Sequence, residues 1–221
     1  MPAVTRLALP AGVGLLALIW LGPLLGAWRE SFSAGMVAHM GVVALAAPLI
    51  ALGMPERWRP GPAMPAALPA LASVVELVVV WGWHAPAMRA AAEASPSVTV
   101  IEQATFLAAG VFLWSTSFAA PGKRVHALTG AGSLLLTSIH MTLLGALLAL
   151  SPRPLYGIGE VTCFGTVLDA GQDQQIGGVV MLLVGALVYL AGGLVLVARL
   201  LEDPASDSLA AGRPPIAPYD R

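Results

Sequence analysis

Six apolar stretches, each about as long as a bilayer is thick, recur along the chain and restrict what it can fold into. They cover roughly residues 7–27, 34–53, 66–84, 98–119, 127–150 and 174–200. A membrane-spanning helix needs about 20 apolar residues. Backbone groups in lipid must pair within the segment, which a helix achieves. We therefore predict an all-α fold, a polytopic transmembrane helical bundle of about six helices.

The composition agrees with a place in the membrane. Hydrophobic residues make up 57% of the 221 residues and charged residues 10%, so one soluble core cannot bury the apolar groups. The formal net charge of -1 offers no basic patch, which speaks against nucleic-acid binding. Cys163 is the single cysteine, so the chain forms no internal disulfide and no paired-thiolate metal site.

The chain divides into two expected parts. Residues 1–203 form the helical bundle, and residues 204–221 form a polar, Pro-rich tail. Such a composition does not support a packed core.

The Lys and Arg residues predict the orientation, because cytoplasmic loops are enriched in them. Eight lie on one side of the six stretches and three on the other. Both termini are therefore expected on the cytoplasmic side of a bacterial inner membrane. The loop with Cys163 then lies outside, where an impermeant thiol reagent should reach it.

The first stretch has a competing interpretation as a signal peptide, with Arg6 as its basic region and cleavage after Ala27. The residue three positions before that cleavage would be Leu25, a poor fit to the small residue preferred there. We favour a retained helix.

Several side chains that are costly to place in lipid gather at two expected depths. His39, His84 and Glu102 lie near the outer ends of their stretches, and Met36 and Met40 share the helix face of His39. We favour a functional over a packing role for such histidines and glutamates, because placing each one in hydrocarbon without a partner costs about 3 kcal/mol. Methionines in apolar runs are more often packing residues.

The second depth is roughly 12 to 16 Å below the outer surface by helix rise. Glu76 and His140 lie there, and we expect them to face the interior and to hydrogen-bond directly or through one water. Thr137 is a further expected partner. Asp173 precedes the last apolar run and is expected first as its N-cap.

Imidazole and thioether groups together suit Cu(I). A b-type haem held by His39 and His140 is the alternative, although their depths differ. A third possibility is a transporter in which Glu76 and His140 relay protons.

Five segments in order along the chain carry a family resemblance. They are AHMGVVALAAPLIALGMP, VVVWGWHAPAM, IEQATFL, LTSIHMTLLGALLAL with PRPLY, and DQQIGGVVM with LVYL. Together they resemble the CtaG family of cytochrome c oxidase assembly factors. The resemblance implies a non-enzymatic membrane protein that assists copper delivery to a haem-copper oxidase from the outer face, with oxidase subunits or copper chaperones as partners.

By this resemblance, His39, His84, Glu102, His140 and Asp173 correspond to the family's motif residues. The chain departs from the pattern at Gly35 and Gln103, where family members often carry histidine. Met36 and Met40 are then possible replacement ligands. The alternative role for His39 is a hydrogen bond to Glu102 that ties two helices together.

Overall fold

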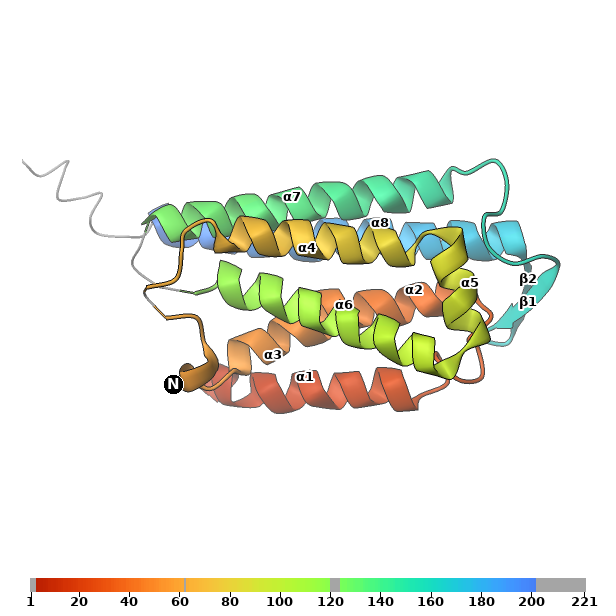
Figure 1. The fold of residues 1–221 in the computed structure, drawn as a ribbon, viewed down its shortest axis with the longest axis horizontal. Coiled ribbons are helices and arrows are strands. Elements are labelled where there is room, and N and C mark those ends of the chain that lie inside the picture. Colours follow the sequence, from red (N-terminus) through yellow and green to blue (C-terminus); the bar gives the residue numbers. More distant parts are fainter. Residues whose placement is uncertain (1–2, 62, 120–123, 202–221) are drawn as a thin grey trace, which may run out of the picture.

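Long helices run side by side in alternating directions and form one bundle (Figure 1). The computed structural model describes residues 3–61, 63–119 and 124–201. The helices are α1 (Ala3–Leu21), α2 (Phe32–Met40), the π-helix η1 (Gly41–Ala46), α3 (Ala47–Gly53), the 3-10 turn η2 (Glu56–Trp58), α4 (Leu68–Trp83), α5 (Pro86–Ala94), α6 (Pro96–Ser117), α7 (Arg124–Ala149) and α8 (Ala170–Leu201). An antiparallel hairpin, β1 (Glu160–Cys163) with β2 (Thr166–Asp169), precedes α8. The expected all-α helical bundle is confirmed.

Four helical segments of the described chain are long and apolar enough to cross a membrane. They are the continuous Phe32–Gly53 unit, α6, α7 and α8. The α4–α5 pair, bent by 71°, is a fifth if it counts as one span, and the apolar part of α1, Arg6–Leu21, is shorter. Length and composition thus make this a membrane protein, but they do not confirm six spans.

Proline marks two helix boundaries, and the first of them differs from the end that the apolar pattern predicts. The first stretch ends as a helix at Leu21 rather than at Ala27, just before Pro23. Between α4 and α5, Ala85 takes an extended conformation (φ -65°, ψ 134°), as the residue before proline prefers. Pro86 then opens α5, which lies across the end of the bundle (Figure 1). This short helix and the β-hairpin were expected as loops.

Helices α7 and α8 approach closely because glycine lines their contact. A Cβ at Gly178 would lie 2.5 Å from the backbone nitrogen of Ala149, and one at Gly145 would lie 2.7 Å from that of Leu182. Small residues that let backbones meet are a common means of helix association in membranes. On the other side, Gly53 of α3 meets the backbone of Leu9, so α1 packs closely against α3.

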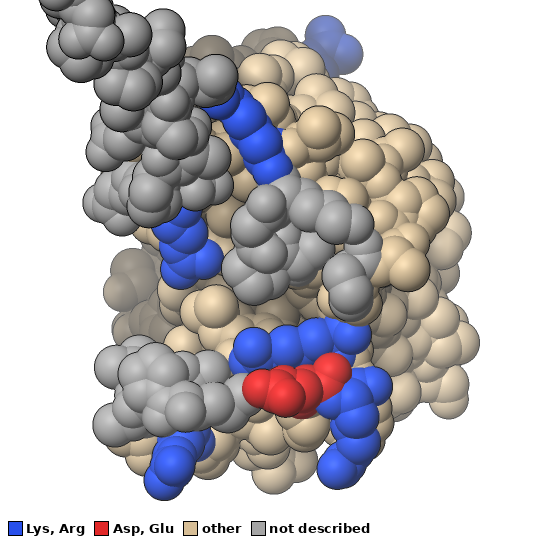
Figure 2. Space-filling model, turned by 90° about the vertical axis from the view of Figure 1, so that its left-hand side faces the viewer, with Lys and Arg blue, Asp and Glu red and all other residues tan. Residues whose placement is uncertain are grey.

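The two ends of the bundle differ in charge. The end where α1 begins and α8 finishes, here called the basic end, carries Arg6, Arg57, Arg59, Arg124 and Arg199. Figure 2 views this end and shows arginine side chains, in blue, around it. The opposite end, with α5 and the hairpin, is called the hairpin end; it carries Arg29, Arg89 and Arg153. The other three basic residues of the count, Lys123, Arg213 and Arg221, and the tail at 204–221 lie outside the described residues.

Cys163 is less accessible than expected. Its side chain is buried, with 2% of its surface exposed, and its sulfur lies 3.5 Å from the Ser33 hydroxyl oxygen. The hairpin folds it against the start of α2. We therefore correct the expectation of ready labelling at this position.

Asp173 does not cap its own helix. α8 begins one turn earlier, at Ala170, and Asp169 and Gln172 cap it reciprocally. The Asp169 carboxylate accepts from the Gln172 backbone N–H at 2.8 Å, while the Gln172 amide oxygen accepts from the Asp169 N–H at 3.2 Å. This is a capping box, which leaves Asp173 free for another partner.

That partner is the first turn of α2. The Asp173 carboxylate accepts hydrogen bonds from the backbone N–H groups of Phe32 (2.5 Å) and Ser33 (3.1 Å) and from the hydroxyls of Ser31 (2.8 Å) and Ser33 (2.5 Å). Its negative charge also suits the positive end of the helix dipole. Asp173 thereby fixes where α2 begins.

Replacing Asp173 by Ala should lower the free energy of unfolding by about 3 kcal/mol or more, because several buried donors lose their acceptor. Thermal unfolding of the purified protein in detergent measures this change. Asp169→Ala is the matched control and should cost about 1 kcal/mol, as expected for an exposed N-cap. Equal effects of the two substitutions would contradict the cross-helix role of Asp173.

Candidate functional site

A small cavity at the hairpin end collects most of the side chains that the sequence places near the outer surface. Its accessible space is about 20 Å³, which is room for one water molecule or one ion. The polar and aromatic groups around it include Met36 and His39 of α2, His84 at the end of α4, Arg89 of α5, and Glu102 and Phe106 of α6. We call this the histidine cavity.

His84 has its hydrogen placed by its own helix. Its Nδ1 lies 2.7 Å from the carbonyl oxygen of Val80, one turn back. A carbonyl can only accept, so Nδ1 carries the hydrogen and Nε2 keeps a lone pair. Metal-binding histidines are commonly oriented in this way, with the second ring nitrogen donating to a backbone carbonyl.

The free nitrogen of His84 faces a sulfur atom. Nε2 lies 3.3 Å from Sδ of Met36, and in the neutral ring neither atom brings a hydrogen to the contact. Nitrogen and sulfur ligands bound at about 2.0 and 2.3 Å in a tetrahedral metal site lie roughly 3.5 Å apart. The pair therefore has the separation of two ligands of one ion.

His39 is buried with no hydrogen bond at all. It is 1% exposed, and neither Nδ1 nor Nε2 has a partner among the described residues. Its ring lies 5.3 Å from that of His84 and 4.1 Å from that of Phe106, centre to centre. The expected alternative, a hydrogen bond to Glu102 that ties α2 to α6, is therefore not formed. A buried polar side chain without a partner is uncommon and points to a missing ligand or water.

Two of the expected site residues do not line this cavity. Met40 is 1% exposed and packs near Gly185 of α8, in the interior of the bundle. His140 of α7 is also buried with both ring nitrogens unpartnered. It does not border the histidine cavity.

The expected direct hydrogen bond between Glu76 and His140 is wrong. Glu76 does face the interior, with 0% exposure, but its Oε1 lies at hydrogen-bond distance, 2.7 Å, from the Tyr189 hydroxyl oxygen. Thr137 pairs with Ser73 at 2.9 Å. The partner of Glu76 thus comes from α8 and not, as the sequence predicted, from α7.

Arg89 is a member of the cavity wall that the sequence did not reveal. It is 8% exposed, its Nε donates to Glu93 at 2.7 Å, and its guanidinium lies 5.7 Å from the Phe32 ring centre. Counted from sequence as a loop charge, it sits instead on α5. The Arg89–Glu93 spacing of four residues after a proline is the signal that could have indicated this helix.

Gly35 makes room for this arginine. A Cβ on Gly35 would lie 2.7 Å from Nη1 of Arg89. The position where the family often has a second histidine is thus filled by a guanidinium from another helix, which cannot bind a metal ion. This chain has fewer imidazoles at the cavity than the family pattern suggests.

Tyr156, in the loop after α7, contacts two residues that line the cavity, His84 and Phe32. Its hydroxyl donates to the backbone oxygen of His84 at 2.6 Å, and its ring stacks on Phe32 with centres 4.4 Å apart. Burial raises the pKa of Tyr156 to about 12. The hydroxyl therefore remains a donor at any physiological pH, and it steadies the end of α4 that holds His84.

A second, larger cavity adjoins the first. It has a volume of about 430 Å³ and lies between the end of α1 and the start of α6, with mostly apolar walls that include Trp20 and Val100. Arg29, Thr99 and Gln103 border both cavities. The Arg29 guanidinium donates to the backbone oxygen of Glu93 at 2.6 Å and so holds the end of α5.

The chemistry of the histidine cavity favours a soft ion. Within the described ranges no three His, Cys, Asp or Glu side chains cluster closely enough to hold a metal ion. The donors that line the cavity are the imidazoles of His39 and His84 and the thioether of Met36, and the Glu102 carboxylate lines it too. Soft thioether and imidazole donors favour Cu(I), whereas Mg²⁺ and Ca²⁺ need oxygen ligands.

Comparison with known proteins identifies the family. The sequence profile described as cytochrome c oxidase caa3 assembly factor (Caa3_CtaG) matches residues 2–203. The chain belongs to this family. No curated protein and no solved structure matches it. Membership in the assembly factor family indicates a non-catalytic role in making cytochrome c oxidase, and it implies contact with oxidase components in general.

Substituting Gly35 by Ala tests the wall of the histidine cavity. The added methyl group should displace the Arg89 guanidinium and lower the free energy of unfolding by about 1 to 3 kcal/mol, the usual cost of overpacking. Thermal unfolding in detergent measures it.

Gly82→Ala is the control, because a Cβ there meets nothing within 4 Å. It should be neutral or stabilising by up to about 1 kcal/mol through helix propensity. A Gly35→Ala protein as stable as the control would show that Arg89 is not confined at this wall.

Proposed function

We propose that this assembly factor binds Cu(I) in the histidine cavity and passes it to a haem-copper oxidase during assembly. The proposal rests on one observation, the buried imidazole of His39 without a partner. Beside it, His84 turns a lone pair toward the Met36 thioether. Leaving such groups unpaired costs free energy, and a bound soft ion would supply the missing interaction.

The donor set suits an ion that is handed on. Copper is here a cargo, and a site with neutral imidazole and thioether donors and no thiolate holds Cu(I) less tightly than a thiolate site would. Glu102 lines the same cavity and adds a carboxyl group beside the proposed ligands. Its one side-chain hydrogen bond is a long contact, 3.4 Å, from the Gln103 amide.

The packing gives no support to a b-type haem between His39 and His140. A macrocycle needs a wide slot, but the histidine cavity has about 20 Å³ of space and Phe106 lies against the His39 ring. A proton relay from Glu76 to His140 is not favoured either, since Glu76 bonds to Tyr189 instead.

The charge difference between the two ends supports an orientation with the basic end on the cytoplasmic side of a bacterial inner membrane. Both termini then lie inside. The histidine cavity lies at the outer face, accessible to a copper chaperone or to an oxidase subunit.

Met36→Leu and His39→Ala should each weaken Cu(I) binding by about tenfold or more, because each removes a proposed ligand. Competition with a chromophoric Cu(I) chelator measures the affinity of the purified proteins. Met40→Leu is the matched control on the same helix and should bind as the unsubstituted protein does, because Met40 does not line the cavity. If Met40→Leu and Met36→Leu lower the affinity equally, the assigned site is wrong.

The same variants connect the site to assembly. In a strain that lacks the native gene, the His39→Ala protein should reach normal membrane levels but fail to restore oxidase activity, with partial rescue by added copper. Full oxidase activity with this variant would remove His39 from the proposed function.

Cysteine labelling tests the orientation. In a Cys163→Ser background, Ile158→Cys lies on the loop at the hairpin end at a fully exposed position (101%), and Trp58→Cys lies at the basic end at 65% exposure. An impermeant maleimide should label the first in intact spheroplasts and the second only after lysis. The reverse pattern would invert the proposed topology.

A further inference from the structure

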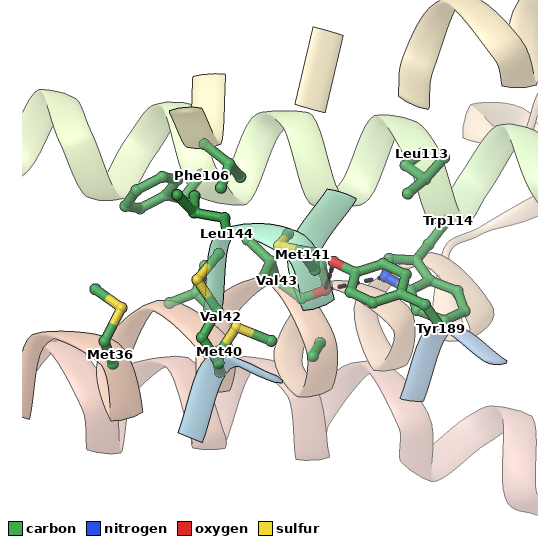
Figure 3. Packing of buried hydrophobic residues seen from close by; sticks show 14 of the residues in the cluster. Met36, Met40, Val42, Val43, Phe106, Leu113, Trp114, Met141, Leu144 and Tyr189 are labelled. Carbon is green, nitrogen blue, oxygen red and sulfur yellow. Dashed lines mark hydrogen bonds between the residues drawn. The ribbon is translucent and has the colours of Figure 1, made fainter. Parts of the chain in front are cut away.

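A polar cluster lies in the bundle below the histidine cavity and has no part in the proposed copper site. The backbone oxygen of Val43, in η1, accepts from Nε1 of Trp114 at 3.0 Å and lies 3.5 Å from the Tyr189 hydroxyl (Figure 3). Tyr189 is also 2.7 Å from Oε1 of Glu76. Four elements, η1, α4, α6 and α8, meet at these groups.

The sequence explains why the Val43 oxygen needs side-chain donors. In η1 the helix widens, so the backbone N–H of Ala47 donates to Val42, five residues back. In the same pattern the carbonyl of Val43 would accept from the residue five positions later, Pro48, which has no N–H. The carbonyl left unpaired by Pro48 is the one that Trp114 and Tyr189 bind.

Counting hydrogens shows how the cluster can be satisfied. Tyr189 has one hydroxyl hydrogen but two oxygen neighbours, Glu76 and Val43. If Glu76 is ionised, Tyr189 donates its hydrogen to the carboxylate. The Tyr189 oxygen and the Val43 carbonyl oxygen then face each other with no hydrogen between them. If Glu76 carries a proton, its O–H donates to Tyr189, and Tyr189 donates to Val43. Both oxygen–oxygen contacts then become hydrogen bonds.

Within the described part of the chain, Glu76 forms no salt bridge. α8 presents the Tyr189 phenol, η1 a backbone carbonyl, α6 an indole and α7 the Thr137 hydroxyl. α7 also carries His140, three residues beyond Thr137, but it makes no hydrogen bond to the carboxyl group. Oε2 of Glu76 has no partner among the described residues. An ionised carboxylate in such a place, inside a membrane, is costly.

We propose that Glu76 is a proton-binding site, occupied in the folded protein, whose proton completes a chain from Glu76 through Tyr189 to the Val43 carbonyl and so holds the π-helical segment in place. The ligand is the proton itself. These hydrogen bonds fix the helical turn that follows His39 in the same continuous helix. The proposal does not depend on whether copper binds.

Infrared spectroscopy of the full-length protein in lipid nanodiscs tests the proton. At pH 7 the unsubstituted protein should show a carbonyl band of a protonated carboxylic acid that shifts in D₂O and is absent from the Glu76→Gln variant. Tyr189→Phe should shift this band, because the acid loses its acceptor. If Glu76→Gln removes no such band at pH 7, the carboxyl group is ionised and the proposal is overturned.

Should Glu76→Gln fail to accumulate, the Tyr189→Phe comparison decides alone, and an unshifted band would overturn the chain. Hydrogen exchange of a peptide covering residues 41–47 tests its effect on the π-helix. Tyr189→Phe should speed exchange there about fivefold, the equivalent of one lost hydrogen bond. Tyr156→Phe, which removes a hydroxyl at the hairpin end, should leave that exchange unchanged; equal rates in both variants would contradict the proposed hold on η1.

Discussion

Polar groups inside an apolar bundle must find their partners within the bundle, and this constraint explains most of the structure. Asp173 of α8 supplies acceptors to the first turn of α2, and Gln174 beside it bonds both the end of α7 and the loop after it. The Val43 carbonyl is served by Trp114 and Tyr189. Each contact joins segments far apart in the sequence, so pairing these groups also fixes how the helices are placed.

The histidine cavity depends on those contacts although none of them lies in it. Asp173 sets the start of α2, and helix geometry then places Met36 and His39 one turn and nearly two turns beyond it. From the other side, Tyr156 and the α4–α5 bend set His84. His39 and His140 both escape this pairing, but of the two only His39 lines the cavity, which is why it carries the functional argument.

The sequence predicted the helical bundle well because a long apolar run in a membrane has one way to satisfy its backbone. It also indicated Met36, His39, His84 and Glu102 as close in depth, since helix rise converts position into height. It could not indicate which helix faces which. The partner of Glu76 was therefore sought on α7 but is Tyr189 of α8, and Asp173 was expected to cap its own helix but caps α2.

Short polar elements escaped the sequence for a different reason. α5, with nine residues, and the two strands of the hairpin, with four each, are far shorter than a membrane span, and they form where the spans end. Pro86 and the Arg89–Glu93 pair were local signals of α5, but the burial of Arg89 depends on Gly35 of another helix. Only the packed structure connects those two positions.

The way in which His84 is oriented has a consequence for how this site tolerates sequence change. Its ring is held by a backbone carbonyl of its own helix, and a side-chain replacement at Val80 leaves that carbonyl in place. The orientation of His39 has no such support and rests on neighbours such as Phe106. The side chain at position 80 therefore does not decide which nitrogen of His84 carries the hydrogen, whereas the ring angle of His39 depends on the size and shape of Phe106.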